Sequence, residues 1–525
     1  IAESDNAAAA TTDTRKADIW EGVLDRETAE QLLLEAGYKD PQALLQNVES
    51  FRNSRQFKAL EKTSRARMDS FMPVLLNRLA EEPDPDLGFA RVFTFVQAVA
   101  QRSVYLVLLL ENSLALSQLI RLCTGSPWVA ELLTRYPVLL DELLRPLSQP
   151  PDKAQLQDQL RQQLLRANPD DIEEQLVNLQ YFRQEQVLVV AAAELAGTME
   201  LMKVSDYLTW VAEVVLAHVL QLAWQLLTRK YGLPFNSNEQ SGELAFVVIA
   251  YGKLGGIELN YGSDLDLVFM HDGHADLETT GGQSGGINSS AFYIQLGQKI
   301  LSLLGTQTLT GKLYEIDMRL RPSGASGALV CTLDSFARYQ HEQAWTWEHQ
   351  ALVRARVVAG AELLAQDFDK VRTGVLGKQR EQAELAADIK NMRLRMRRQL
   401  GSRNQNTFHM KQDAGGLVDI EFIVQYLVLC WSHRYPGLLE FTDNMRLLDV
   451  AANTGLLEKT AAARLQDIYI RYRLSLHALA LDKSSYKLPA TEFAQERATV
   501  TTIWNNLFGA LEPATSHNPE VPGLS

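Results

Sequence analysis

The chain contains few cysteines and no long apolar run. Its three cysteines, Cys123, Cys331 and Cys430, are separated by roughly a hundred residues or more, a spacing that favours neither a disulfide framework nor a close-spaced metal site. The longest uninterrupted apolar runs, at 104–110 and 187–193, are much shorter than the roughly 20 residues that a membrane-spanning helix needs. We therefore expect a cytoplasmic protein that does not enter a membrane.

Basic residues are scarce relative to acidic ones. The chain has 51 Lys and Arg residues against 64 Asp and Glu residues, which gives a net charge of −13. This balance disfavours a sequence-independent coat on nucleic acid. It also disfavours a template-independent RNA polymerase or a tRNA-end transferase, because the sequence shows no basic surface studded with aromatic residues. We expect no nucleic-acid partner.

The N-terminal residues lack the features of a secretory signal. Residues 1–16 are rich in Ala, Thr and Asp and have neither a charged start nor an apolar stretch. Position 1 is Ile rather than Met, so we expect the chain to be a piece of a longer protein. Its 525 residues are enough for about three domains, and 46% hydrophobic and 22% charged residues are typical of globular proteins.

Hydrophobic periodicity predicts an α+β, predominantly helical protein. Residues 19–240 have the apolar spacing of three and four that is typical of helices, and this pattern returns from about 360 to 511. The stretch between them predicts a helix at 289–304 and a small mixed sheet, with N-terminal helices on one side and a C-terminal helical bundle on the other. The predicted strands are 245–250, 265–270, 313–318 and 328–332.

These patterns also suggest how the chain is divided. The mixed α/β part is flanked by two helical parts, and each end is polar. The predicted divisions are a disordered tail or linker at 1–18, an N-terminal helical region at 19–165, a mixed α/β domain at 166–360, a C-terminal helical domain at 361–512 and a tail at 513–525.

The segment 251–272, YGKLGGIELNYGSDLDLVFMHD, carries the clearest chemical signal. Asp264 and Asp266 alternate with Leu265 and Leu267. Successive side chains of a strand point to opposite faces, so both carboxylates leave one face while the leucines enter the core. Two adjacent like charges are costly without a cation, and Mg²⁺ prefers one or two carboxylates together with substrate phosphates. The sequence predicts a magnesium site that also needs its nucleotide.

Neighbouring residues suit a phosphate. Glycines lie just upstream of the acid pair and allow main-chain N–H groups to approach phosphate oxygens, and Lys253 adds a point charge. The segment is neither a Walker loop nor a Rossmann fingerprint. A third acid, Asp317, is followed at the same parity by Arg319 and Arg321, whose guanidiniums can each meet two phosphate oxygens. One acid and two cations are expected to face the same site.

This arrangement resembles the nucleotidyltransferase superfamily of DNA polymerase β. In that superfamily a Gly-Gly or Gly-Ser turn precedes Asp-x-Asp on one strand, and a third acid lies on a later strand; Gly255-Gly256, Asp264, Asp266 and Asp317 fit these positions. Three further segments resemble the bifunctional glutamine synthetase adenylyltransferases of bacteria, which add AMP to glutamine synthetase and remove it. They are YEIDMRLRPSGASGALV from Tyr314, AWTWEHQALVRARVVAG from Ala344 and KQDAGGLVDIEFIVQYLVL from Lys411.

The resemblance also indicates which half of such an enzyme the chain represents. The family carries two related nucleotidyltransferase halves, and WTWEHQALVRAR resembles the C-terminal, adenylylating half. Only one GKLGG…SDLDL block occurs, so we expect the other half to be absent from this chain. The resemblance makes 166–360 a nucleotidyltransferase domain.

The resemblance implies roles for particular residues. The catalytic residues, which also hold two Mg²⁺ ions, are Asp264, Asp266 and Asp317. The nucleotide-binding residues are Gly252, Lys253, Gly255, Gly256, Ser263, Arg319 and Arg321. The implied reaction transfers AMP from ATP to a tyrosine of glutamine synthetase, releases pyrophosphate and lowers glutamine synthetase activity in nitrogen regulation. The implied partners are glutamine synthetase and the PII signalling protein, with glutamine as an effector.

Two other functions remain open. The same metal site suits the opposite chemistry, in which phosphate removes AMP from the modified tyrosine. A non-enzymatic alternative is a regulatory module that binds glutamine synthetase or PII while another half performs catalysis.

Some patterns outside the acid segment have simpler interpretations. The basic cluster from Arg393 to Arg398 is interpreted as a solvated helix face, and 345–356 as a helix packed on the nucleotide domain. Asp413, Asp419 and Glu421 flank Gly415-Gly416, where we expect a helix to start, and acids there complement the helix dipole.

Overall fold

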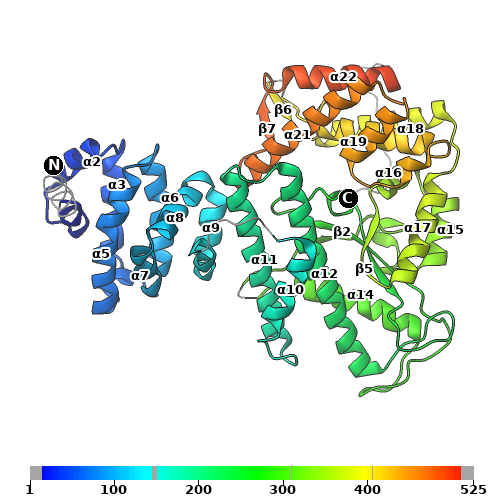
Figure 1. Cartoon of the computed structure of the whole chain (residues 1–525), viewed down its shortest axis with the longest axis horizontal. Coiled ribbons are helices and arrows are strands. Elements are labelled where there is room, and N and C mark those ends of the chain that lie inside the picture. Colours follow the sequence, from blue (N-terminus) through cyan, green and yellow to red (C-terminus); the bar gives the residue numbers. More distant parts are fainter. Residues whose placement is uncertain (1–14, 145–150, 309, 405, 510–525) are drawn as a thin grey trace.

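The N-terminal half of the described chain is a series of helices that runs toward a small sheet. The structure is a computed structural model and describes residues 15–509, except 145–150, 309 and 405. The predicted tails at 1–18 and 513–525 lie outside the described residues, apart from 15–18, which begin a short helical segment. Figure 1 shows these helices at one end and the sheet with the later helices at the other.

The predicted N-terminal helices are confirmed. Many begin at an Asp, Ser or Asn whose side chain accepts a hydrogen bond from a backbone N–H of the first turn, as Asp40 and Ser126 do. They are α2 (Arg26–Glu35), α3 (Pro41–Asn53), α4 (Arg55–Lys58), α5 (Lys62–Leu79), α6 (Pro85–Val99), α7 (Val104–Glu111), α8 (Ser113–Gly125), α9 (Pro127–Arg135), η1 (Pro137–Leu144), α10 (Lys153–Leu164), α11 (Ile172–Leu195) and α12 (Leu201–Tyr231).

Helix α12 is the longest of the described helices and supports the sheet. It is long and apolar enough to span a bilayer by length and composition, but 61% of its most apolar window is buried inside the protein. It packs on α10, α11, α14 and β5. Its apolar character is therefore explained by its place in the core.

The sheet is mixed and lies in the middle of the sequence. Its main path has the order β3-β2-β1-β5; β1 is antiparallel to β2 and β5, and β2 is parallel to β3 and β4. The elements are β1 (Phe246–Ala250), α13 (Gly252–Gly255), β2 (Leu265–His271), α14 (Ser289–Gly305), β3 (Ile316–Asp317), η2 (Gly324–Ser326), β4 (Val330–Thr332) and β5 (Arg356–Gly360).

Helices return after β4, as predicted, and cover the other side of the sheet (Figure 1). They are α15 (Leu333–Glu342), α16 (Thr346–Val353), α17 (Glu362–Leu376), α18 (Gln382–Leu400), α19 (Leu417–Trp431), η3 (Pro436–Leu439), α20 (Asn444–Asn453), α21 (Lys459–Leu481) and α22 (Ala494–Phe508). We call α15–α22 the C-terminal helical region.

Several strands differ from the sequence prediction. Strand β5 was missed, and its first residue, Arg356, was interpreted as the end of the helix predicted at 345–356, whereas that helix, α16, ends at Val353. The predicted strand at 313–318 is reduced to the two residues of β3. A two-stranded ribbon of β6 (Thr407–His409) and β7 (Lys487–Pro489) was also missed, since three-residue strands leave too little alternation to detect.

Each face of the sheet packs on a different set of helices. In β2, Leu265, Leu267 and Phe269 belong to the core shared with the N-terminal helices and α14. The intervening Val268 and Met270 belong to the core shared with the C-terminal helical region. The period-two alternation of a strand therefore divides the protein into two cores that meet at the sheet.

A buried carboxylate connects the sheet to the C-terminal helical region. Glu258, 1% exposed, forms ion pairs with Arg354 and Arg473. It also accepts hydrogen bonds from Tyr469 Oη, at 2.6 Å, and from Asn444 Nδ2, at 3.1 Å. Burial disfavours the charge of Glu258, but the two arginines outweigh burial and lower the pKa of the carboxyl. This cluster fixes the loop after α13 against α20 and α21.

We expect Glu258→Gln to lower the free energy of unfolding by about 3–5 kcal/mol, because the change leaves buried arginines without their carboxylate. Urea denaturation followed by circular dichroism measures the effect. The matched control is Glu131→Gln, which removes an exposed ion pair with Lys483 and is expected to cost at most about 1 kcal/mol. Equal costs for the two variants would contradict a central role for Glu258.

Candidate active site

The three predicted catalytic acids lie together on one face of the sheet. Strands β2 and β3 pair Asp266 with Asp317 in register, and register partners point to the same face. Asp264 is two residues before Asp266, and the charges of Asp264 and Asp317 both act on the Asp266 carboxyl. The face is the one that the C-terminal helical region covers, because Val268 has the same parity.

The surroundings of Asp266 disfavour its charged form. Burial, with the neighbouring Asp264 and Asp317, raises the pKa of Asp266 to about 6. A carboxylate in this position is destabilised by like charge, and a cation bound between the acids relieves that repulsion.

Asp317, at the end of β3, is bound by Arg319 of the loop that follows. Arg319 donates from Nε to Oδ2 at 2.8 Å and from Nη2 to the same oxygen at 2.5 Å. The hydrogen bonds from Arg319 keep the pKa of Asp317 below its ordinary value. Arg319, predicted to bind phosphates, thus contacts the third acid, while its side chain is 80% exposed.

Arg321 organises the loop that follows β3. Its guanidinium donates to three main-chain carbonyl oxygens, those of Met318 at 2.7 Å, Ala325 at 2.9 Å and Gly327 at 3.2 Å. These bonds fix the loop that carries Asp317 and Arg319. A phosphate contact by Arg321 stays a prediction.

Asp264 and Asp266 suit Mg²⁺ only if phosphate oxygens and water supply the other metal ligands. Within the described part of the chain, no three His, Cys, Asp or Glu side chains are arranged to hold a metal ion. Asp317 is engaged by Arg319, which leaves Asp264 and Asp266 as the available carboxylates. Two carboxylates suit a Mg²⁺ that takes its remaining ligands from phosphate oxygens and water.

Lys253 and Ser263 lie beside the acids. Lys253 Nζ donates to Ser263 Oγ at 3.4 Å, and Ser263 Oγ accepts from the N–H of Asn260 at 3.1 Å. Burial lowers the pKa of Lys253, while the charge of Asp264 opposes that effect. The two predicted nucleotide-binding side chains are therefore together at the entrance to β2.

The three glycines predicted to bind the nucleotide lie against different neighbours. Gly252 has φ +56°, and a Cβ there would come within 2.2 Å of Asp266 Oδ2. A Cβ on Gly255 would come within 1.9 Å of the carbonyl oxygen of Arg354, and one on Gly256 within 2.5 Å of the Arg354 guanidinium. Gly252 thus allows the backbone to reach an acid, whereas Gly255 and Gly256 accommodate Arg354. Their phosphate role stays a prediction.

Arg354 is a structural residue that sequence patterns did not identify. It is buried, and it pairs with Glu258 and with Glu421, whose Oε1 accepts from Nη1 at 2.7 Å. The signal that was available is the resemblance of its segment to the family motif, but one sequence does not pair Arg354 with the two glutamates.

The basic cluster at 393–398 is only partly a solvated face. Arg393 is fully buried and donates from Nε to Asp419 Oδ1 at 2.6 Å, which corrects the interpretation for this residue. Asp419 lies in the first turn of α19, as predicted, and also accepts from Arg397 and from the N–H of Gly415. The cluster therefore shapes the loop before α19.

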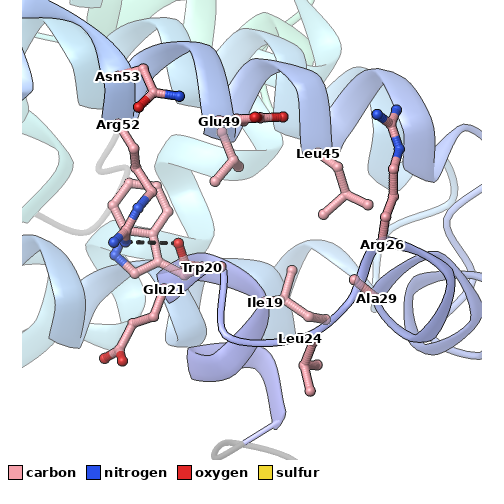
Figure 2. Close-up of a pocket in the computed structure, with 12 residues that line it drawn as sticks. Ile19, Trp20, Glu21, Leu24, Arg26, Ala29, Leu45, Glu49, Arg52 and Asn53 are labelled. Carbon is pink, nitrogen blue, oxygen red and sulfur yellow. Dashed lines mark hydrogen bonds between the residues drawn. The ribbon is translucent and has the colours of Figure 1, made fainter.

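A separate pocket lies far along the chain from these acids. Figure 2 shows it between the segment 19–24, α2 and α3, with a volume of about 400 Å³. Arg52 crosses it and donates to the carbonyl oxygen of Trp20 at 2.8 Å. Its lining comes from residues 19–53, so it shares no residue with the acid site.

Comparison with known proteins shows similarity to an adenylyltransferase family. The sequence model of the glutamate-ammonia ligase adenylyltransferase family matches residues 116–371, a range that includes all three acids. The model of the GlnD PII-uridylyltransferase family matches 383–501, in the C-terminal helical region.

Adenylyltransferase relatives match nearly the whole chain. A protein named bifunctional glutamine synthetase adenylyltransferase/adenylyl-removing enzyme, from Pseudomonas aeruginosa, is 46% identical over 519 residues, or 96% of this chain and 53% of the relative. Proteins of the same name from Pseudomonas putida (46% over 503 residues) and Acinetobacter baylyi (43% over 476 residues) cover 93% and 89% of this chain and 51% of each relative. The chain spans about half the length of these relatives.

Substitution of Gly255 tests whether Arg354 fills the space beside it. We expect Gly255→Ala to lower the free energy of unfolding by about 1–3 kcal/mol, because the added methyl group overlaps main-chain atoms. Gly374→Ala is the control: this helical glycine faces open space, and the change is expected to stabilise by about 0.5–1 kcal/mol. Thermal unfolding of both variants measures these changes in stability. An unchanged unfolding temperature for Gly255→Ala would contradict the close contact between Gly255 and Arg354.

The repulsion among the acids gives a pH-dependent prediction. Asp266 has a folded-state pKa near 6, above its unfolded value near 4. Ionisation of Asp266 therefore lowers the free energy of unfolding, and this loss develops as the pH rises from about 4 to 6. Without divalent cations, Asp266→Asn should therefore raise the unfolding temperature at pH 8 and change it little at pH 4. Calorimetry in a chelator-containing buffer measures the difference; an equal effect at both pH values rules out charge repulsion as the cause.

Proposed function

We propose that the chain transfers AMP from ATP to a tyrosine of glutamine synthetase, releases pyrophosphate, and thereby lowers glutamine synthetase activity in nitrogen regulation. The names of the relatives support adenylyl transfer involving glutamine synthetase. The observation that carries the proposal is the meeting of Asp264, Asp266 and Asp317 on one sheet face, with Lys253 beside them.

Different residues act on the reacting phosphate and on the attacking tyrosine. Asp264 and Asp266 would hold Mg²⁺, which supplies positive charge to the reacting phosphate when bound. Lys253, next to Ser263, lies where it can neutralise phosphate charge. An Asp is ionised at neutral pH, and the hydrogen bonds from Arg319 lower the pKa of Asp317 further, so its carboxylate is in the form that accepts a proton. A tyrosine hydroxyl with a pKa near 10 needs such help to react.

The reverse chemistry is the second candidate. The relatives' name also includes an adenylyl-removing activity, and the same acids and lysine suit attack by phosphate on the AMP–tyrosine bond. Incubation of modified glutamine synthetase with inorganic phosphate would release ADP in that case. A non-catalytic role as a PII-binding or glutamine synthetase-binding module predicts neither AMP transfer nor ADP release.

The proposed partners are glutamine synthetase and PII, with glutamine as an effector. The match of 383–501 to a PII-uridylyltransferase family supports a link to PII. We propose a cytoplasmic location, which is supported by the absence of disulfides among Cys123, Cys331 and Cys430, all of them described and free.

Substitution of the acid pair tests the proposed reaction. We expect Asp264→Asn and Asp266→Asn each to slow AMP transfer from labelled ATP to glutamine synthetase by at least about 100-fold, because each removes a charge that stabilises the transition state. The control is Asp276→Asn, an exposed acid of the loop after β2, which should leave the rate unchanged. Wild-type turnover in either acid-pair variant would end the proposal.

A further inference from the structure

A second lysine approaches the acids from the C-terminal helical region. Lys411 lies in the loop between β6 and α19 and is half-buried. Burial and then the charge of Lys253 lower the pKa of Lys411 to about 8, against the opposing effect of Glu421 and Asp264. Two lysines from distant parts of the sequence thus share one electrostatic environment at the acid site.

The loop that carries Lys411 is rigidly held. Asp413 accepts from the N–H groups of His409 and Ser402, each at 2.7 Å, and Asp419 accepts from the N–H of Gly415 at 2.7 Å. The carbonyl oxygen of Gly415 accepts from Tyr472 Oη at 2.8 Å. These bonds fix the loop against α21 before any ligand binds.

Helix α21 brings this loop to the segment between α13 and β2. Arg473, next to Tyr472, donates from Nη2 to the carbonyl oxygen of Glu258 at 3.0 Å. Three residues further along α21, the carbonyl oxygen of Leu476 accepts from Asn260 Nδ2 at 3.4 Å. The loop of Lys411 and the segment that precedes the acid pair are therefore attached to the same two turns of one helix.

Within the described part of the chain, neither lysine ammonium forms an ion pair. Lys411 Nζ lies over the Tyr486 ring, 4.5 Å from its centroid, and Lys253 Nζ donates to Ser263 Oγ. Two carboxylates, Asp264 and Glu421, act on both lysines through their charge, and Glu421 is held by Arg354 at 2.7 Å. Two half-buried cations without ion pairs repel each other, and a bound polyanion removes that repulsion.

We propose that Lys411 binds the β- or γ-phosphate of the nucleoside triphosphate, so that the C-terminal helical region supplies part of the nucleotide site. The inference rests on the proposed function. The position of the acids on the sheet face that this region covers places the triphosphate between Lys253 and Lys411. A compact ammonium suits a phosphate oxygen as a point charge.

The test compares nucleotides of different charge. Calorimetric titration measures MgATP and MgAMP binding to the wild-type chain, to Lys411→Met and Lys411→Arg, and to Lys487→Met. Lys487 is the matched control, because it is exposed on β7 next to the same loop and no ion pair of its ammonium is among the described contacts. Thermal unfolding of each variant reports on folding.

We expect Lys411→Met to weaken MgATP binding by roughly tenfold or more, as for loss of a charge-assisted hydrogen bond, and MgAMP binding by less than about twofold. Lys411→Arg should keep most of the MgATP affinity, and Lys487→Met all of it. In the transfer assay, Lys411→Met should raise the KM for ATP by a similar factor. Unfolding temperatures should stay within a few degrees of the wild-type value.

The outcomes separate this inference from the proposed function. MgATP binding by Lys411→Met at wild-type strength, or an equal loss of MgATP and MgAMP affinity, overturns the role of Lys411 while AMP transfer by the wild-type chain stands. Failure of the wild-type chain to bind MgATP overturns both.

Discussion

The two faces of β2 must each be covered, and this constraint organises the protein. Leu265, Leu267 and Phe269 enter the core with the N-terminal helices, while Val268 and Met270 enter the core with the C-terminal helical region. A strand buried on both sides offers a polar side chain space only near its end. Asp264 and Asp266 lie at that end, on the face toward the later helices. The position of the acids is therefore a consequence of how the sheet is buried.

Charge connects the sheet to the later helices as firmly as apolar packing does. Glu258 is a buried carboxylate surrounded by Arg354, Arg473, Tyr469 and Asn444. Within the C-terminal helical region, a second buried pair joins Arg393 of α18 to Asp419 of α19. Buried ion pairs require closely matched partners, because an unmatched charge in a low-dielectric interior is very costly. The ion pairs of Glu258 therefore restrict the position of the later helices relative to the sheet.

The acid site itself is left with unbalanced charge. Asp266 is near two other carboxylates, and Lys253 is near Lys411, so like charges face each other within both groups. Glu258 and Asp419 form ion pairs with arginines, whereas no ion pair joins these acids to these lysines among the described residues, so their charges offset one another only in part. In a magnesium nucleotide the metal ion is positive and the phosphates are negative, so the metal complements the acids and the phosphates complement the lysines. This complementarity is the physical basis for our assignment of the site.

The sequence by itself determined the helical character of both flanking regions, the helix at 289–304, and the common face of Asp264 and Asp266, because periodicity of 3.6 and 2 is a local property. It also pointed to Asp317, whose register with Asp266 only the structure established. The sequence did not predict β5, since a short strand directly after a helix has no separate pattern.

Only the tertiary structure decided which residues share charge. Gly255 and Gly256 suggested room for phosphate in the sequence, whereas in the fold they accommodate Arg354. Arg393 looked like one cation of a surface cluster and is buried on Asp419. Lys411 lies about 160 residues from Lys253, yet helix α21 binds the segments that follow both, at Gly415 and Glu258, and the two lysines influence each other's charge. Such pairings depend on distances between elements that are remote in the chain, and local periodicity carries no information about those distances.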